Sequence, residues 1–243
     1  SSSTNFGYNP VALPNSYVTG TAIDNDTAGV TVTESGGTTN VTEGGSTDSY
    51  TVVLTSQPTS TVEIIFSTST LGVTLSTSTI SFSSDNWNAA QTVTVSATND
   101  STDEPSPHTS TVTHAASSTN YGYTSALSIS SVTANITDND AAGLTLSKDY
   151  TTSTEGGSTD SFTVLLNTQP TSTVEILLTT STGGISISTS TLTFDANNWN
   201  SAKTVTVTAI DDVIAQATHT AVVTLTSSST NFGYNPVALP NSY

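Results

Sequence analysis

Acidic side chains are the main chemical resource of this chain, which has 19 Asp and Glu residues and formal charge −17. They gather in short segments: a Thr-Glu-Gly-Gly turn that occurs twice, an acidic loop in each half, and an Asp-Asn-Asp tripeptide that also occurs twice. Carboxylate oxygens from several loops are the ligands that Ca²⁺ takes, six to eight of them. The candidate metal ligands are Glu43, Asp100, Asp103, Glu104, Asp138, Asp140, Glu155, Asp211, Asp212, Asp24 and Asp26.

Other kinds of chemistry are poorly supported. Lys148 and Lys203 are the only basic residues, so the phosphate contacts that bind nucleic acid or anionic lipid are missing. There is no cysteine, no nucleophile elbow, no phosphate-binding glycine loop and no paired-histidine metal motif, which indicates that the protein is not an enzyme. His108, His114 and His219 are interpreted as structural strand residues. No apolar run approaches the roughly 20 residues of a membrane span, so we expect no direct membrane insertion.

Internal repeats define the domain organisation. Residues 42–64 match residues 154–176 at 19 of 23 positions, an offset of 112. The first 17 residues recur unchanged as residues 227–243, an offset of 226. We therefore predict that residues 1–23 are the terminal strand region of a preceding repeat, that residues 24–137 form the first repeat, and that residues 138–243 form the second. The second repeat would lack its last strand, supplied by the next repeat or by a neighbouring chain.

Alternation of apolar residues with Ser or Thr, rich in β-branched side chains, is typical of half-buried strands. In the first repeat this pattern predicts strands near residues 30–33, 49–56, 61–68, 78–82, 91–98, 109–116 and 127–136. About seven strands in roughly 100 residues favour an all-β protein of tandem immunoglobulin-like antiparallel sandwiches.

Loops of such a sandwich alternate between its two ends, so the first and fifth connections share an end with the exit of the seventh strand. These are the acidic segments. Two carboxylates about 4 Å apart repel by roughly 4 kcal/mol at an effective dielectric of 20, which favours a bound cation. The alternative is that these acids are solvated turn residues, a common role for Asp. The second repeat is a weaker candidate, because residues 213–217 contain no acid.

The order TEGG, QPTSTVEI, NWN, TVTV and DND resembles the bacterial Calx-β-type repeats of large surface proteins, over essentially the whole chain. The resemblance implies a Ca²⁺-binding β-sandwich used in tandem, in adhesins and extracellular fibres, without catalysis. On this basis we expect a structural protein at the cell surface, either the shaft of an adhesin or the protomer of an extracellular filament, joined covalently or by strand exchange. Its expected partners are identical repeats in the same or a neighbouring chain.

Two further readings stay open. Asn25, Asn40, Asn99 and Asn135 begin sequons for N-linked glycans. An alternative function is a ligand-binding module of a surface adhesin that recognises ice or glycan. Trp87 and Trp199, with the Asn-aromatic-Gly-Tyr turns, are expected at the other end of each sandwich. There they would meet the acidic end of the preceding repeat, cap their own cores, or do both.

Overall fold

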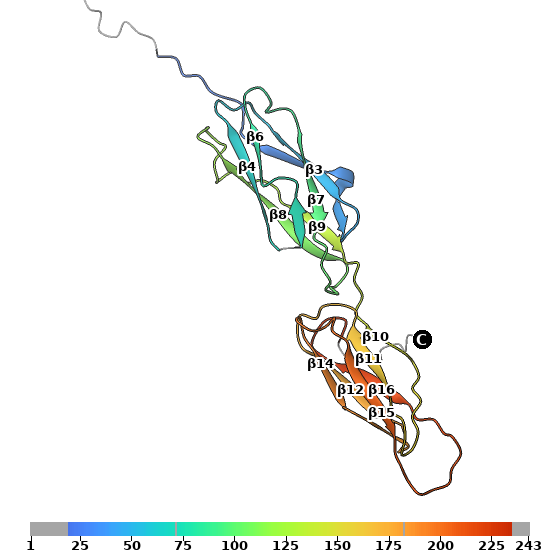
Figure 1. Cartoon of the computed structure of the whole chain (residues 1–243). Helices are drawn as coiled ribbons and strands as arrows, with labels where there is room; N and C mark the ends of the chain where they lie inside the picture. The colour runs from blue at the N-terminus through green and yellow to red at the C-terminus, as the bar shows by residue number, and fades with distance from the viewer. Residues whose placement is uncertain (1–18, 71, 182, 235–243) are drawn as a thin grey trace, which may run out of the picture.

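Two β-sandwiches lie end to end in the computed structural model, which describes residues 19–70, 72–181 and 183–234 (Figure 1). Module one, residues 24–137, contains β1 (Val30–Glu34), β2 (Thr39–Thr42), β3 (Asp48–Leu54), β4 (Val62–Thr68), β5 (Val73–Leu75), β6 (Thr79–Phe82), β7 (Gln91–Ala97), β8 (His108–Ser117) and β9 (Val132–Thr137). Module two, from residue 138, contains β10 (Leu144–Leu146), β11 (Asp160–Leu166), β12 (Val174–Thr180), β13 (Ile185–Ile187), β14 (Thr191–Phe194), β15 (Lys203–Ala209) and β16 (Val223–Ser228).

The predicted all-β immunoglobulin-like fold is confirmed. Module one packs a four-stranded sheet, β1-β3-β7-β5, against a five-stranded sheet, β2-β9-β8-β4-β6. Buried and exposed residues alternate along the strands, as in β4, because successive side chains point to opposite faces. Helical structure in the described residues is limited to the 3-10 turn Ser35–Gly37. The Ser and Thr side chains between the apolar positions form the outer faces of the sheets.

The strand prediction was incomplete in two places and too long in a third. β2 and β5 were not predicted, because each is short and has too few apolar residues to show alternation. The last predicted strand, 127–136, begins only at Val132, since Leu127 and Ile129 pack against the core from a loop. The nine strands of module one therefore exceed the seven that the pattern indicated.

Pairing with β9 makes residues 39–42 a strand, β2. It pairs with β9 in parallel, with Thr39 opposite Ala134 and Thr42 opposite Thr137. The other edge of β9 pairs with β8 in antiparallel fashion. The strand that closes module one therefore lies between two neighbours, and β2 and β9 end together at the same end of the sandwich.

In each module, a buried tyrosine hydroxyl bonds the backbone of a loop at the end opposite to that of Thr42 and Thr137 or their counterparts. The Tyr123 hydroxyl donates to the carbonyl of Ser56 at 2.8 Å and accepts from its amide at 3.1 Å. Tyr234 makes the equivalent pair of bonds with Thr168. Trp87 and Trp199 pack against the cores of their own modules, which supports the core-capping interpretation of these two residues.

Module two repeats the first sheet but not the second. Its four-stranded sheet has the order β10-β11-β15-β13, whereas the opposite sheet has only β14-β12-β16 among the described residues. Segments 151–154 and 219–222 are not strands there, although their counterparts in module one belong to β2 and β8. Residues 19–23 likewise form no strand, and the rest of the predicted terminal strand region lies outside the described residues.

The two modules meet through short loops. The Gln169 amide donates to the Ser101 carbonyl at 2.7 Å, and the Ala142 amide donates to the Asp103 carboxylate. Gly233 has a φ of 76°, and a side chain there would collide with both Ala142 and Asp103. Within the described part of the chain, no helix has the length and apolar character needed to cross a membrane.

Candidate metal centre

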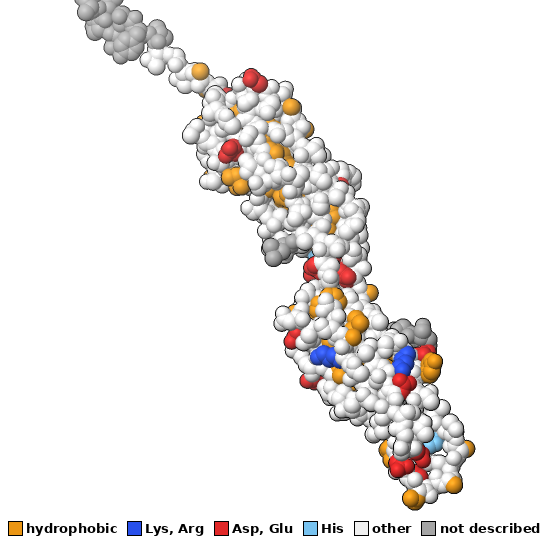
Figure 2. All heavy atoms as spheres, in the orientation of Figure 1, with side chains coloured by type: hydrophobic (Ala, Val, Ile, Leu, Met, Phe, Trp, Pro, Cys, Tyr) orange, Lys and Arg blue, Asp and Glu red, His pale blue; other side chains and the backbone are white. Residues whose placement is uncertain are grey.

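Parallel pairing of β2 with β9 places two acidic segments side by side. The last residues of these strands, Thr42 and Thr137, lie opposite each other, so Glu43 and Asp138 follow at the same end of the sheet. The Glu43 amide donates to the Thr137 carbonyl at 3.0 Å and extends the ladder by one bond. The loop between β7 and β8 brings Glu104 to the same place. Figure 2 shows acidic side chains gathered where module one meets module two.

Glu43 is the centre of the cluster. Its side chain is 2% exposed, and Oε2 has no hydrogen-bond partner. One carboxylate oxygen of Glu43 lies within 4.8 Å of ligand atoms of Asp138 and Asp140, and a second group within the same distance joins it to Glu104 and His108. Oδ2 of Asp140 is likewise buried without a partner. Buried acceptors without donors are unusual in proteins, and they are what an oxygen-ligated cation satisfies.

The pKa values of Glu43 and Asp140 indicate that their ionised forms are unfavourable in the cluster. Burial raises the pKa of Glu43 above its usual range, and repulsion from Asp100, Asp138 and Glu104 raises it further. Burial also raises the pKa of Asp140, with added repulsion from Asp138 and Asp100. Both shifts mean that the ionised carboxylates are destabilised in this environment. A divalent cation would reverse that effect.

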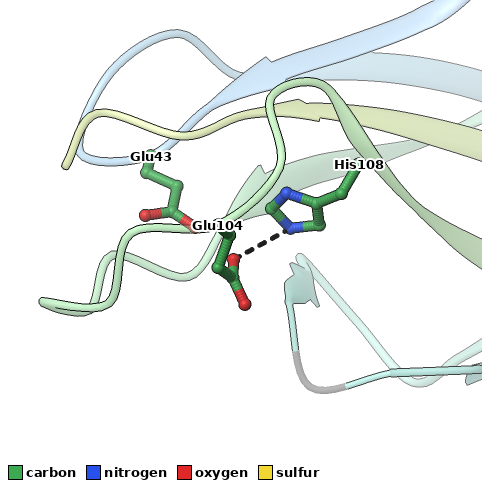
Figure 3. Close-up of side chains that lie close together, drawn as sticks. All are labelled: Glu43, Glu104 and His108. Carbon is green, nitrogen blue, oxygen red and sulfur yellow. Dashed lines mark ion pairs between the residues drawn. The ribbon is translucent and has the colours of Figure 1, made fainter. Parts of the chain in front are cut away.

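His108 belongs to this cluster, which the sequence analysis did not predict. Its Nε2 lies 3.2 Å from Oε2 of Glu104, and the two side chains face Glu43 (Figure 3). Nδ1 of His108 is buried without a partner. The pairing of β8 with β9 could have revealed this position: His108 lies at the start of β8, opposite Ile136, and Ile136 is two residues before Asp138. His114 is instead structural: its ring bonds the Ser130 carbonyl and the Tyr50 hydroxyl, and it packs edge-on against Tyr50 and Phe66.

Backbone and amide contacts hold the acidic segments in place. Asp138 accepts from the amides of Glu104 at 2.9 Å and Asp140 at 3.1 Å, so one carboxylate orients both neighbouring segments. The Asn139 side chain donates to the Glu43 carbonyl at 2.9 Å and to Oδ1 of Asn99 at 2.8 Å. These hydrogen bonds hold the acidic segments against one another without the help of an ion.

Gly44 is required by this arrangement. Its φ is 59°, and a Cβ built on it would stand 2.7 Å from Oδ1 of Asn99. Glycine adopts this left-handed conformation without a steric penalty, and it leaves room for the neighbouring loop. Gly156 repeats the conformation in module two, with φ 60°.

Two predicted ligands of module one lie at the margin of the cluster. Asp100 caps its own loop by accepting from the Thr102 amide at 2.7 Å, and it acts on Glu43 and Asp140 through its charge. Asp103 turns toward module two and accepts from the Ala142 amide. Burial raises the pKa of Asp103, and the charge of Asp138 adds to the effect. Asp103 therefore links the cluster to the junction.

The remaining predicted ligands are not brought into such a group. Asp24 and Asp26 lie on an exposed segment, where the Asp26 amide donates to Oδ1 of Asp24 at 3.1 Å. That turn matches the one between Asp138 and Asp140. In module two Glu155, Asp211 and Asp212 are exposed.

Gln216 lies in the acidic loop of module two, which corresponds to the loop between β7 and β8 in module one. Its amide nitrogen donates to Oδ2 of Asp212 at 3.2 Å and to Oε1 of Glu155 at 3.5 Å. An uncharged donor therefore reduces the repulsion that carboxylates alone would feel. No His, Asp or Glu group of module two comes together like the one around Glu43 within the described residues.

Neither of the two lysines, both of which the structure describes, pairs with a carboxylate of the cluster in module one. Lys148 pairs with Asp160, and Lys203 bonds the Thr193 carbonyl with its ammonium group over the Phe194 ring. Both lysines belong to module two. The cluster around Glu43 thus has four carboxylates and one imidazole, of which the carboxylates suit a hard cation such as Ca²⁺.

No protein-family model and no curated protein matches this sequence. Among solved structures, the chain is similar to the D0-D1 domain of Intimin at 20% identity and a TM-score of 0.28, covering 86% of this chain and 95% of that one. It is also similar to CBD12 from CALX1.2 at 14% identity and a TM-score of 0.33, covering 87% and 83%.

Proposed function

We propose that the chain is a structural protein, a tandem β-sandwich building block for an extracellular filament or the shaft of a surface adhesin. The end-to-end arrangement of the modules supports this role (Figure 1). The proposal assigns no catalytic role, because the His, Asp and Glu side chains that come together among the described residues lie between loops at the module junction.

The observation that carries the proposal is the buried, unpartnered carboxylate of Glu43 at the end of module one that faces module two. Glu43, Glu104, Asp138 and Asp140 would hold a Ca²⁺ ion, with His108 beside them. Bound Ca²⁺ would neutralise the repulsion among these carboxylates and supply the missing partners of their buried oxygens. Because Asp138 and Asp103 connect the cluster to the junction, binding would also restrict the angle between the modules.

The building blocks are joined in one of two ways, by covalent continuation into further repeats or by exchange of a strand between chains. In both, the junction between successive sandwiches repeats along the fibre. We also propose that the asparagines of the N-linked sequons can carry glycans. Asn40 and Asn135 bond each other on the outer face of the sheet at 3.0 Å.

Calorimetric titration of the full chain with Ca²⁺ tests the metal proposal, with Zn²⁺ as the comparison. We expect one Ca²⁺ site in module one and a raised melting temperature of that module. Small-angle scattering should show a narrower range of intermodule angles with Ca²⁺ than with chelator. Absence of heat and an unchanged melting temperature would refute the metal site, and preference for Zn²⁺ would place His108 among the ligands instead.

A further inference from the structure

Among the described residues, module two has no strand at the place where β9 closes module one. In module one, residues 108–112 of β8 pair with β9, and only Val112–Ser117 pair with β4. Module two retains the second pairing, because β16 pairs with β12 through residues 223–228. The counterparts of residues 108–111, namely 219–222, are not a strand. They lack the partner that β9 provides in module one.

The counterpart of β2 is missing for the same reason. β2 pairs only with β9 among the strands of module one, and the corresponding segment 151–154 forms no strand. The two segments that would flank such a strand, 151–154 and 219–222, are therefore both irregular in the described part of the chain. A single added strand between them would restore both ladders.

The gap between these segments is a groove of about 980 Å³. Its floor is apolar and includes Leu146, Phe162, Val207 and Leu225, and its rim includes Tyr150 and Ile214. Val112 is fully buried in module one, whereas its counterpart Val223 is only partly covered. Tyr150 is 74% exposed and Ile214 65% exposed. Exposed apolar groups of this size beside an unpaired edge indicate a docking surface.

The chain also carries a segment that resembles the missing strand. Residues 18–26 read VTGTAIDND, and residues 132–140, which contain β9, read VTANITDND. The part of that segment from residue 19 onward is exposed and forms no strand. In Figure 1 it leads away from module one at the end opposite module two. Residues 1–17, which precede it, have the same sequence as residues 227–243 of module two.

We propose that residues 19–26 of a second copy of this chain add to module two as its closing strand. The proposal rests on the structural role given above and supplies the joint of the filament. The register of β8 with β9 places Thr21 opposite Thr220 and Ala22 opposite His219. The register of β2 with β9 likewise places Thr21 opposite Thr152. Main-chain hydrogen bonds to both neighbours give the affinity, as in other cases of strand addition.

Strand addition would also change the acidic end of module two. In module one, the residues that follow β9 bring Asp138 and Asp140 to Glu43. The same geometry brings Asp24 and Asp26 of the donor beside Glu155 and Asp212 of the acceptor. Ca²⁺ would therefore strengthen the joint, because the donor adds two carboxylates to those of Glu155 and Asp212.

A disulfide trap in the full chain tests the register. The natural sequence has no cysteine, and Thr21 and Thr220 are both exposed. Directly opposed residues of antiparallel strands have Cα atoms about 4.5–5.5 Å apart, within the range of a disulfide. After oxidation, the T21C/T220C variant should form a ladder of multiples of 24.8 kDa on a non-reducing gel. The matched control T21C/T145C, with its second cysteine on the exposed outer edge of β10, should form no such ladder.

Two outcomes of the trap would overturn the proposal. One is a pattern equal to that of the control, and the other is an internal crosslink that leaves a monomer. Appending residues 18–26 after Tyr243 should fill the groove from within the same chain and abolish the ladder. A ladder that persists in this variant would mean that the groove is not the acceptor.

Sedimentation of substituted full chains gives an independent measurement. Thr21→Pro removes a ladder donor and should weaken self-association at least about tenfold, whereas Thr21→Val should leave it intact. Both substitutions lie on an exposed segment outside every strand, so an unchanged circular dichroism spectrum verifies folding. Equal association of the two variants would refute strand addition. Ca²⁺ binding by module one does not involve this segment, so the two proposals can fail separately.

Discussion

Replacing Glu43 by Gln should change the stability of module one in opposite directions with and without Ca²⁺. Glu43 is buried and shares a 4.8 Å cluster with two other carboxylates. At that separation and an effective dielectric of about 20, each ionised pair repels by roughly 3 kcal/mol, of which screening and partial protonation leave about 1 kcal/mol. In chelator, the substitution should therefore raise the melting temperature of module one by about 4–8 °C.

In Ca²⁺ the order reverses. At a concentration about 100 times the dissociation constant, Ca²⁺ would stabilise the natural module by about 2.7 kcal/mol. A tenfold weaker site in the variant would retain about 1.4 kcal/mol of that effect at the same concentration. The Ca²⁺-dependent rise in melting temperature should thus fall to about half in Glu43→Gln.

Tryptophan fluorescence separates the modules, because Trp87 packs on the core of module one and Trp199 on that of module two. The assay uses a Trp199→Phe background, so that Trp87 alone reports unfolding. Glu63→Gln, an exposed change on β4, is the matched control, and it should leave the melting temperature unchanged both in chelator and in Ca²⁺. The reasoning is refuted if Glu43→Gln lowers the melting temperature in chelator, or if its Ca²⁺ response equals that of the natural chain.

The other expected outcomes concern pH, the glycine turn and the buried tyrosine. The pKa values of Glu43 and Asp140 are raised in the folded chain, so protonation of these two carboxyls stabilises the fold, and this stabilisation is lost as pH rises through those values. In chelator, module one should therefore have a higher melting temperature at pH 5 than at pH 7. In Ca²⁺ the melting temperature should instead be higher at pH 7. Gly44→Ala should cost about 1–3 kcal/mol in thermal unfolding, since it strains a positive φ and displaces Asn99, whereas Gly20→Ala, with open space around it, should cost nothing measurable. Tyr123→Phe should cost module one about 1–3 kcal/mol by chemical denaturation, because the backbone of Ser56 loses its partner, while module two unfolds unchanged.

Much of the fold was predictable because it depends on local alternation. The predicted strands around residues 49–56, 61–68, 78–82 and 91–98 correspond to β3, β4, β6 and β7. β2 was missed because its pairing is non-local: its partner β9 lies 95 residues further along the chain, from Thr39 to Ala134. Short strands of this kind are specified by a distant partner, and their own residues give little signal.

The candidate site was predictable as a gathering of loops but not in its details. The end-to-end alternation of loops placed Glu43, Glu104, Asp138 and Asp140 at one end of module one, and the structure brings them together. It did not reveal that Asp103 turns toward module two, nor that His108 joins Glu104. Those positions depend on side-chain direction and on contacts across the junction, which spacing along the sequence does not encode.

The position of β9 between β2 and β8 determines how module one would respond to tension. The chain leaves β9 toward module two, so in the proposed fibre a pull would act along the axis of this strand. Backbone bonds of the two ladders run across that axis, through four residue pairs to β2 and five to β8. The strand cannot peel away one bond at a time and must slide past both neighbours together. Module one therefore bears tension in shear, the geometry in which a sheet resists extension most strongly.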